Sequence, residues 1–123
     1  MSEGDPIKIH REATTLYDCK KYEEAAEKFL RAAELYEKVQ NFFDASYSLF
    51  KAGECKFFLE KYEDAVEYFM KSAEVAFSKG FDRFGLSALE YARDCYQKLR
   101  KAEEIEKLQS KIEELKKKLS TSF

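Results

Sequence analysis

The sequence has no tryptophan, one histidine, one proline and only four glycines in 123 residues. An all-β fold needs a tight turn roughly every 8 to 12 residues, and so little glycine and proline cannot supply these turns. A disordered chain would lack the 11 phenylalanines and 8 tyrosines that are present. The composition therefore predicts an all-α protein, and the length fits a single domain over residues 1–123.

The sequence also lacks a strong net charge and any long apolar run. Its 22 basic and 24 acidic residues give a net charge of −2, so bulk charge predicts no nucleic-acid partner. The apolar runs are short, whereas a membrane-spanning helix needs about 20 apolar residues. The polar, acidic first residues do not resemble a signal peptide, and the end has no prenylation cysteine. We expect a cytoplasmic protein without an integral membrane segment.

Residues that carry chemistry are few. The wide spacing of Cys19, Cys55 and Cys95 matches neither a zinc site nor a disulfide framework. Each lies in a helical pattern, so we expect three small, partly buried apolar side chains. The single histidine, His10, cannot form a metal cluster or a histidine relay alone and is expected on the surface. We expect no metal, no cofactor and no enzymatic activity.

The most informative feature is an internal repeat. The segment 21–35 reads KYEEAAEKFLRAAEL, and the segment 61–75 reads KYEDAVEYFMKSAEV. Eight of the fifteen positions are identical and six others exchange similar residues. The same shift applied once more reaches 101–115, where Lys101, Glu103 and Glu104 persist without the aromatic residues. A period of about 40 residues is typical of helical repeat proteins.

Each unit contains two helical patterns with one apolar row each. Ala25, Phe29, Ala32 and Tyr36 lie at i, i+4, i+7 and i+11, and the row recurs in the next unit over 65–76. Alternating small and large residues allow close helix packing, and Gly53 in the preceding helix predicts a tight crossing. Such helices cannot bury their apolar rows alone, so the units should stack into a curved solenoid.

Capping residues set the expected helix bounds. Asp5 and Pro6 predict a helix start, while Asn41 and Gly80 predict helix ends with a left-handed backbone. No glycine or proline separates Cys95 from Leu119, so one long terminal helix is an alternative there. The expected helices span about 6–19, 22–39, 43–59, 62–79, 82–99 and 102–119.

These features resemble the tetratricopeptide repeat superfamily. The residues that carry the resemblance are Tyr22, Ala25, Phe29 and Ala32 in the first unit, and Ala52, Gly53, Tyr62, Ala65, Phe69 and Ala73 in the second. The long period is similar to that of soluble NSF attachment proteins. The resemblance implies a right-handed α-solenoid of three helix-turn-helix repeats, about six antiparallel helices, with repeats at about 6–40, 42–80 and 82–119.

The resemblance also implies a function and a site. In this superfamily the first helix of each repeat lines a concave groove that binds a peptide or helix of a partner protein. The corresponding groove residues are His10, Thr14, Tyr17, Tyr47, Phe50, Glu54, Phe57, Glu90, Asp94 and Gln97. The set is aromatic in its middle and acidic toward the third unit, which suits a partner with an apolar anchor and a basic flank.

Three alternatives stay open. The chain could act as an adaptor in complex assembly, as the attachment proteins do. Glu90 and Asp94 lie one helical turn apart and could form a catalytic carboxylate pair, although such spacing arises often in a chain with 24 acidic residues. The terminal apolar row could cap the solenoid or pair two chains as a homodimer; it consists of Ile105, Leu108, Ile112, Leu115 and Leu119.

Overall fold

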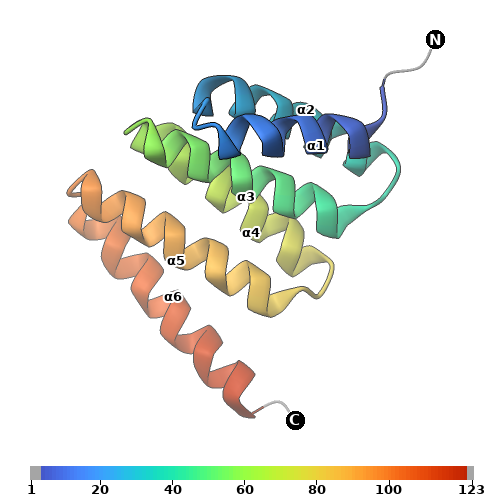
Figure 1. Ribbon diagram of the computed structural model, residues 1–123. Coiled ribbons are helices and arrows are strands. Elements are labelled where there is room, and N and C mark those ends of the chain that lie inside the picture. The colour runs from blue at the N-terminus through green and yellow to red at the C-terminus, as the bar shows by residue number, and fades with distance from the viewer. Residues whose placement is uncertain (1–3, 122–123) are drawn as a thin grey trace.

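The computed structural model describes residues 4–121, which form six α-helices and no strand. The helix bounds agree closely with those expected from the sequence, and α5 and α6 are separate helices. Consecutive helices pack against one another, which confirms the all-α class (Figure 1). The helices are α1 (Pro6–Asp18), α2 (Tyr22–Lys38), α3 (Phe42–Phe58), α4 (Tyr62–Ser78), α5 (Asp82–Lys98) and α6 (Ala102–Thr121).

The turns between consecutive helices share one backbone geometry. In each turn, the second residue after the helix has a positive φ. These residues are evenly spaced along the chain and are Lys20, Gln40, Glu60, Gly80 and Arg100. The next residue then donates its backbone N–H to a carbonyl near the end of the preceding helix, as from Phe81 to Ala76 at 2.9 Å. This bond satisfies a carbonyl that the helix end would leave unpaired.

The caps were predicted correctly in two of three places. The Asp5 carboxylate accepts a hydrogen bond from the backbone N–H of Ile7 at 3.0 Å, and Gly80 has a φ of 82°. The expectation for Asn41 is wrong, because the left-handed residue there is Gln40. Asn41 instead begins α3, where its side-chain oxygen accepts from the N–H of Asp44 at 3.3 Å. Asparagine is favoured both as a left-handed residue after a helix and as an N-cap, so the residue type alone did not separate the two roles.

The core contains the apolar rows that the repeat predicted. Ala25 and Phe29 of α2 and their counterparts Ala65 and Phe69 of α4 have no exposed surface. Gly53 of α3 lies directly against Phe69, since a Cβ atom at this glycine would stand 2.8 Å from the ring. The close approach expected at Gly53 is confirmed.

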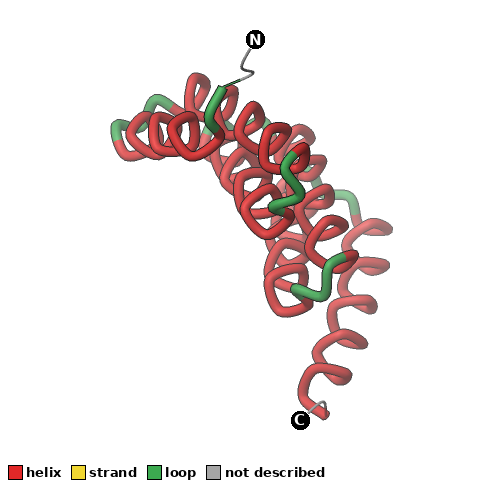
Figure 2. Tube along the Cα trace, turned by 90° about the vertical axis from the view of Figure 1, so that its right-hand side faces the viewer, coloured by secondary structure: helices red, strands yellow, loops and turns green. Residues whose placement is uncertain are grey.

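The helices form two rows in a bent stack. Figure 1 shows α1, α3 and α5 toward the viewer, with α2, α4 and α6 behind them. The side view of Figure 2 shows that the stack bends toward the row of α1, α3 and α5. These three helices therefore occupy the inner side of the curve.

The terminal row of α6 packs inside the chain. Leu108 and Ile112 are buried against Leu89 and its neighbours on α5 and α4, and Ile105, Leu115 and Leu119 are half-buried. The opposite side of α6 is polar and carries the ion pairs Lys107 with Glu103 and Lys118 with Glu114. The centre of the row is thus already covered by this chain.

Among residues 4–121, no helix combines the length and the apolar content that a membrane span requires.

Candidate functional site

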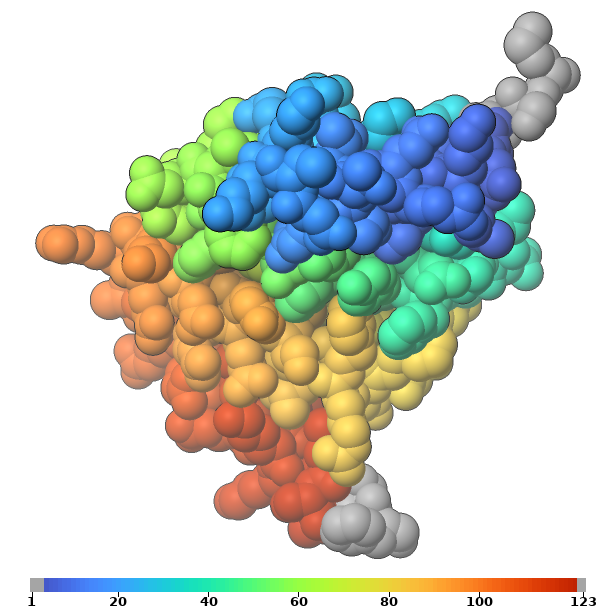
Figure 3. Space-filling model, viewed as in Figure 1, coloured from blue at the N-terminus to red at the C-terminus, as the bar shows by residue number. Residues whose placement is uncertain are grey.

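The exposed side of α1, α3 and α5 forms the inner face of the stack. On α3 it consists of a row spaced by four, four, three and four residues, which is one stripe of a helix. The positions one repeat earlier on α1 and one repeat later on α5 are exposed or half-buried as well. Figure 3 views this face, with α1 in blue, α3 in green and α5 in yellow to orange. Its residues are Ile7, Arg11, Thr14 and Asp18, then Phe43, Tyr47, Lys51, Glu54 and Phe58, then Arg83, Ser87, Tyr91, Asp94 and Lys98.

Large apolar side chains concentrate on this face. Phe43 is 43% exposed, Tyr47 36%, Phe58 48% and Tyr91 42%, and Ile7 is exposed as well. Among the described residues only six large apolar side chains are exposed, and five of them belong to the inner face. Exposed apolar side chains gathered on one face mark an interaction surface more often than scattered ones do.

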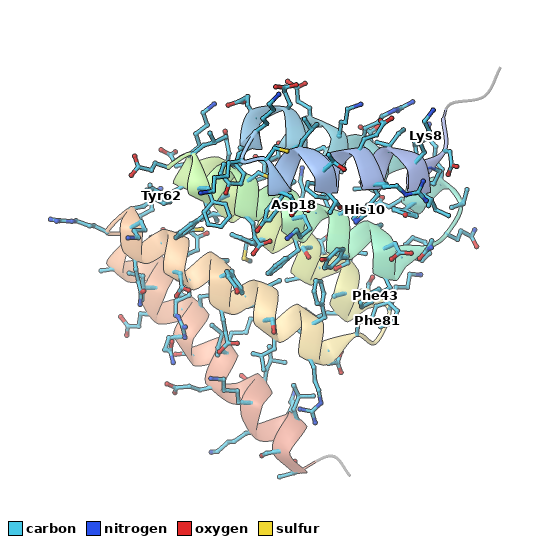
Figure 4. The ribbon with its side chains drawn as sticks, in the orientation of Figure 1. Lys8, His10, Asp18, Phe43, Tyr62 and Phe81 are labelled. Carbon is cyan, nitrogen blue, oxygen red and sulfur yellow. The ribbon has the colours of Figure 1, made fainter. Side chains whose placement is uncertain are left out.

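The aromatic side chains form two clusters. In the first, which we call the α3–α5 cluster, the Phe43 ring lies 5.2 Å from Phe81 and 5.6 Å from Phe84, and Tyr47 lies 6.4 Å from Phe84. Phe43 and Phe81 are labelled in Figure 4, at the end of the molecule where α4 turns into α5. A shallow depression of about 460 Å³ lies beside them and is also lined by Arg83.

The second cluster joins α1 to the other end of α3. The Phe58 ring lies 4.9 Å from Tyr22 and 6.1 Å from Tyr17, and Phe57 lies 5.3 Å from Tyr62. We call this the α1–α3 cluster. Rings held by such neighbours keep fixed orientations, so a ligand would meet a preformed surface.

A polar group of Lys51 and Glu54 adjoins the α1–α3 cluster at Tyr17. Lys51 Nζ lies 2.8 Å from Glu54 Oε1 and 3.7 Å from the centre of the Tyr17 ring, and the Tyr17 hydroxyl donates to Glu54 at 3.3 Å. Burial raises the pKa of the Tyr17 phenol, and the Glu54 charge adds to this. Burial alone would lower the pKa of the Lys51 ammonium, but its interactions with Glu54 and Tyr17 together outweigh this effect and raise it. The group is therefore charged and internally compensated.

The predicted residues from α1 lie on or beside the inner face. Thr14 is exposed, and its hydroxyl donates to the His10 carbonyl of its own helix at 3.0 Å. His10 is half-buried rather than a plain surface residue, because its Nδ1 lies 3.1 Å from Ser48 Oγ and its ring meets Phe29 at 5.2 Å. Burial lowers the pKa of its imidazole, against an opposing effect of Asp44.

Among the predicted residues of α3, Tyr47 and Glu54 lie on the inner face but Phe50 and Phe57 point elsewhere. Phe50 is 9% exposed and packs on Phe69 at 5.2 Å, so it belongs to the core. Phe57 is partly buried against the same core, and its neighbour Phe58 is the exposed member of the pair. The adjacent phenylalanines project in different directions because each helical residue turns by about 100°.

The predicted residues of α5 are polar and mostly paired. Glu90 lies 3.1 Å from Lys116 of α6, and Asp94 lies 3.5 Å from Arg93, whereas Gln97 is exposed. The predicted set did not include Phe43, Phe58 and Tyr91, which are exposed on the inner face. A usable signal existed on α3, because Phe43 and Phe58 lie away from its apolar row of alanine and leucine residues.

The cysteines divide into two kinds. Cys55 and Cys95 have no exposed surface, and burial raises the pKa of their thiols to about 12. They pack as apolar side chains, as expected, but the expectation of partial burial is wrong for Cys19, which is exposed. Within residues 4–121, no three His, Cys, Asp or Glu side chains gather closely enough to hold a metal ion.

Comparisons of the chain with models of protein families, with curated proteins and with solved structures give no match.

Proposed function

We propose that the chain is a tetratricopeptide-like module of three helical hairpins in a right-handed solenoid, which binds a peptide or helix of a partner protein without catalysis. The observation that supports this proposal is the concentration of exposed apolar side chains on the inner face. Large aromatic residues dominate the binding energy of protein interfaces, because they bury much area at little entropic cost.

The acids of the predicted site give little reason to expect a basic partner, because each lies close to a basic group of the same chain. The three acids of the predicted site, Glu54, Glu90 and Asp94, lie 2.8, 3.1 and 3.5 Å from basic groups of the same chain. Compensated acids attract a basic flank only weakly. The partner segment is therefore expected to bind mainly through apolar anchors that reach the α3–α5 and α1–α3 clusters.

A displayed library of short peptides tests the proposal. Peptides selected on the purified chain would be titrated against a variant with Tyr47→Ser and Tyr91→Ser, and we expect at least about tenfold weaker binding. Val39→Ser is the matched control, since Val39 is 65% exposed but lies outside the inner face. Thermal melting would establish that both variants fold. Equal affinity of the selected peptides for the double variant and the wild type would refute the inner face as the binding site.

A further inference from the structure

A second groove lies on the opposite side of the molecule, between α2 and α4. It has a volume of about 480 Å³ and is lined by Leu30 of α2, Leu49 of α3 and Val75 of α4 among others. Leu49 is buried at its base, whereas Leu30 and Val75 are half-buried on its walls. We call it the outer groove. Its apolar residues do not belong to the inner face.

The rim of the outer groove is acidic. Glu34, Glu37 and Glu74 line it, and the only basic residue among its lining residues is Lys71. Lys71 is engaged by Glu67 at 3.0 Å; that hydrogen bond is the main reason why the pKa of its ammonium is raised, and the charge of Glu37 contributes. Glu34 lies 3.6 Å from Arg31. In the part of the chain that the structure describes, no ion pair is formed by Glu37 or Glu74.

A related groove one repeat later has a less acidic rim than the outer groove. Between α4 and α6, a smaller space of about 280 Å³ is lined by residues at equivalent positions of the next repeat. The stacking of hairpins thus produces a furrow at each step. Phe77 takes the place of Glu37, so an acid is lost at this position of the second furrow, whose volume is smaller. The equivalent residues are Met70, Ala73, Phe77 and Leu89, in place of Leu30, Ala33, Glu37 and Leu49.

We propose that the outer groove binds a partner segment in which a large apolar side chain is flanked by lysine or arginine residues. The apolar side chain would contact Leu30, Leu49 and Val75, and the flanking cations would lie near Glu37 and Glu74. Charge complementarity selects this occupant, because an acidic or neutral segment would leave the two carboxylates without a partner. This surface is separate from the inner face and does not depend on the function proposed for it.

A fluorescein-labelled amphipathic peptide built of leucine and lysine at helical spacing is a suitable probe, with glutamate in place of lysine as the control peptide. Fluorescence anisotropy should show binding of the lysine peptide only, and the affinity should fall with added salt. Glu34→Gln, Glu37→Gln and Glu74→Gln together should weaken binding by about tenfold or more. Val75→Arg should do the same, because it places a cation in the groove wall.

Two controls locate the binding site. Glu24→Gln, Glu63→Gln and Glu106→Gln remove the same charge from exposed positions outside the groove and should change the affinity by less than about threefold. The Tyr47→Ser and Tyr91→Ser variant should bind the probe as the wild type does. Absence of binding to the wild type, equal loss in both glutamine variants, or loss only in the inner-face variant would each overturn the proposal.

Discussion

At the residue scale, small side chains decide how closely the helices approach. Gly53 allows the Phe69 ring to lie against the backbone of α3. Ala25 of α2 and Ala65 of α4, which occupy the same position in successive repeats, are fully buried. Ser46 and Ser72 extend the contact between α3 and α4, because each hydroxyl donates to the carbonyl of the other residue, at 2.9 and 2.8 Å. Buried hydroxyls are tolerated here because both are satisfied.

Gly53→Ala should destabilise the protein despite the better helix propensity of alanine. The new Cβ would stand 2.8 Å from the fully buried Phe69 ring. Overpacking of this kind costs about 1 to 3 kcal/mol, which opposes a propensity gain of about 1 kcal/mol. We expect a net loss of the order of 1 kcal/mol in the free energy of unfolding, measured by urea denaturation.

Phe69→Leu provides the matched background for this prediction. A smaller side chain leaves room for the Cβ, so Gly53→Ala should become neutral or stabilising there, with a coupling of about 1 kcal/mol or more. Additive effects of the two substitutions would show that the contact between Gly53 and Phe69 does not limit the packing.

At the scale of elements, the helical hairpins depend on one left-handed residue per turn. Four of the five are not glycine: Lys20, Gln40, Glu60 and Arg100 have φ values between 56° and 62°. A side chain in this conformation costs roughly 1 to 2 kcal/mol relative to the right-handed region. Packing of the flanking helices must offset this cost, so the turns are positions where the sequence is not optimal for stability.

Glu60→Gly should therefore stabilise the protein. Glycine removes the backbone strain but adds freedom to the unfolded chain, and the expected net gain is about 0.5 to 1 kcal/mol. Gly80→Ala is the converse control, and it should destabilise by a similar amount because nothing lies within 4 Å of the added Cβ and only the backbone strain acts. Thermal unfolding of both variants measures the effect. A lower melting temperature for Glu60→Gly would contradict the account of the turns.

At the scale of the whole molecule, stability comes from stacking each hairpin on the next. The contacts run mainly between consecutive helices, so each terminal helix covers a core surface that would otherwise meet water. At the C-terminal end this role belongs to α6, whose Leu108 and Ile112 cover Leu89 and Ala92. Its polar outer side ends the stack, which is the arrangement that a cap requires.

A version of the chain that ends at Arg100 should aggregate or unfold, whereas the full chain should sediment as a monomer. The truncation uncovers the apolar surface under Leu108 and Ile112. In the full chain, Ile112→Ala should cost about 2 to 5 kcal/mol, and Lys111→Ala, at an exposed neighbouring position, should cost little. A full chain that sediments as a dimer, together with a stable monomeric truncation, would favour the alternative in which the α6 row pairs two chains.

The sequence by itself determined the all-α class and most helix bounds, because the repeat and the apolar rows are local patterns along the chain. It left open whether the segment after Cys95 is one helix or two, and the structure has two, α5 and α6. It also predicted the burial of Phe29 and Phe69 and the close contact at Gly53. Only the tertiary structure decided the direction of Phe50 and Phe57, since a rotation of about 100° separates a core side chain from its exposed neighbour and depends on how neighbouring helices pack. Only the tertiary structure placed Glu34 and Glu37 of α2 and Glu74 of α4 at the rim of one groove. Residues so far apart along the chain meet only when the hairpins stack.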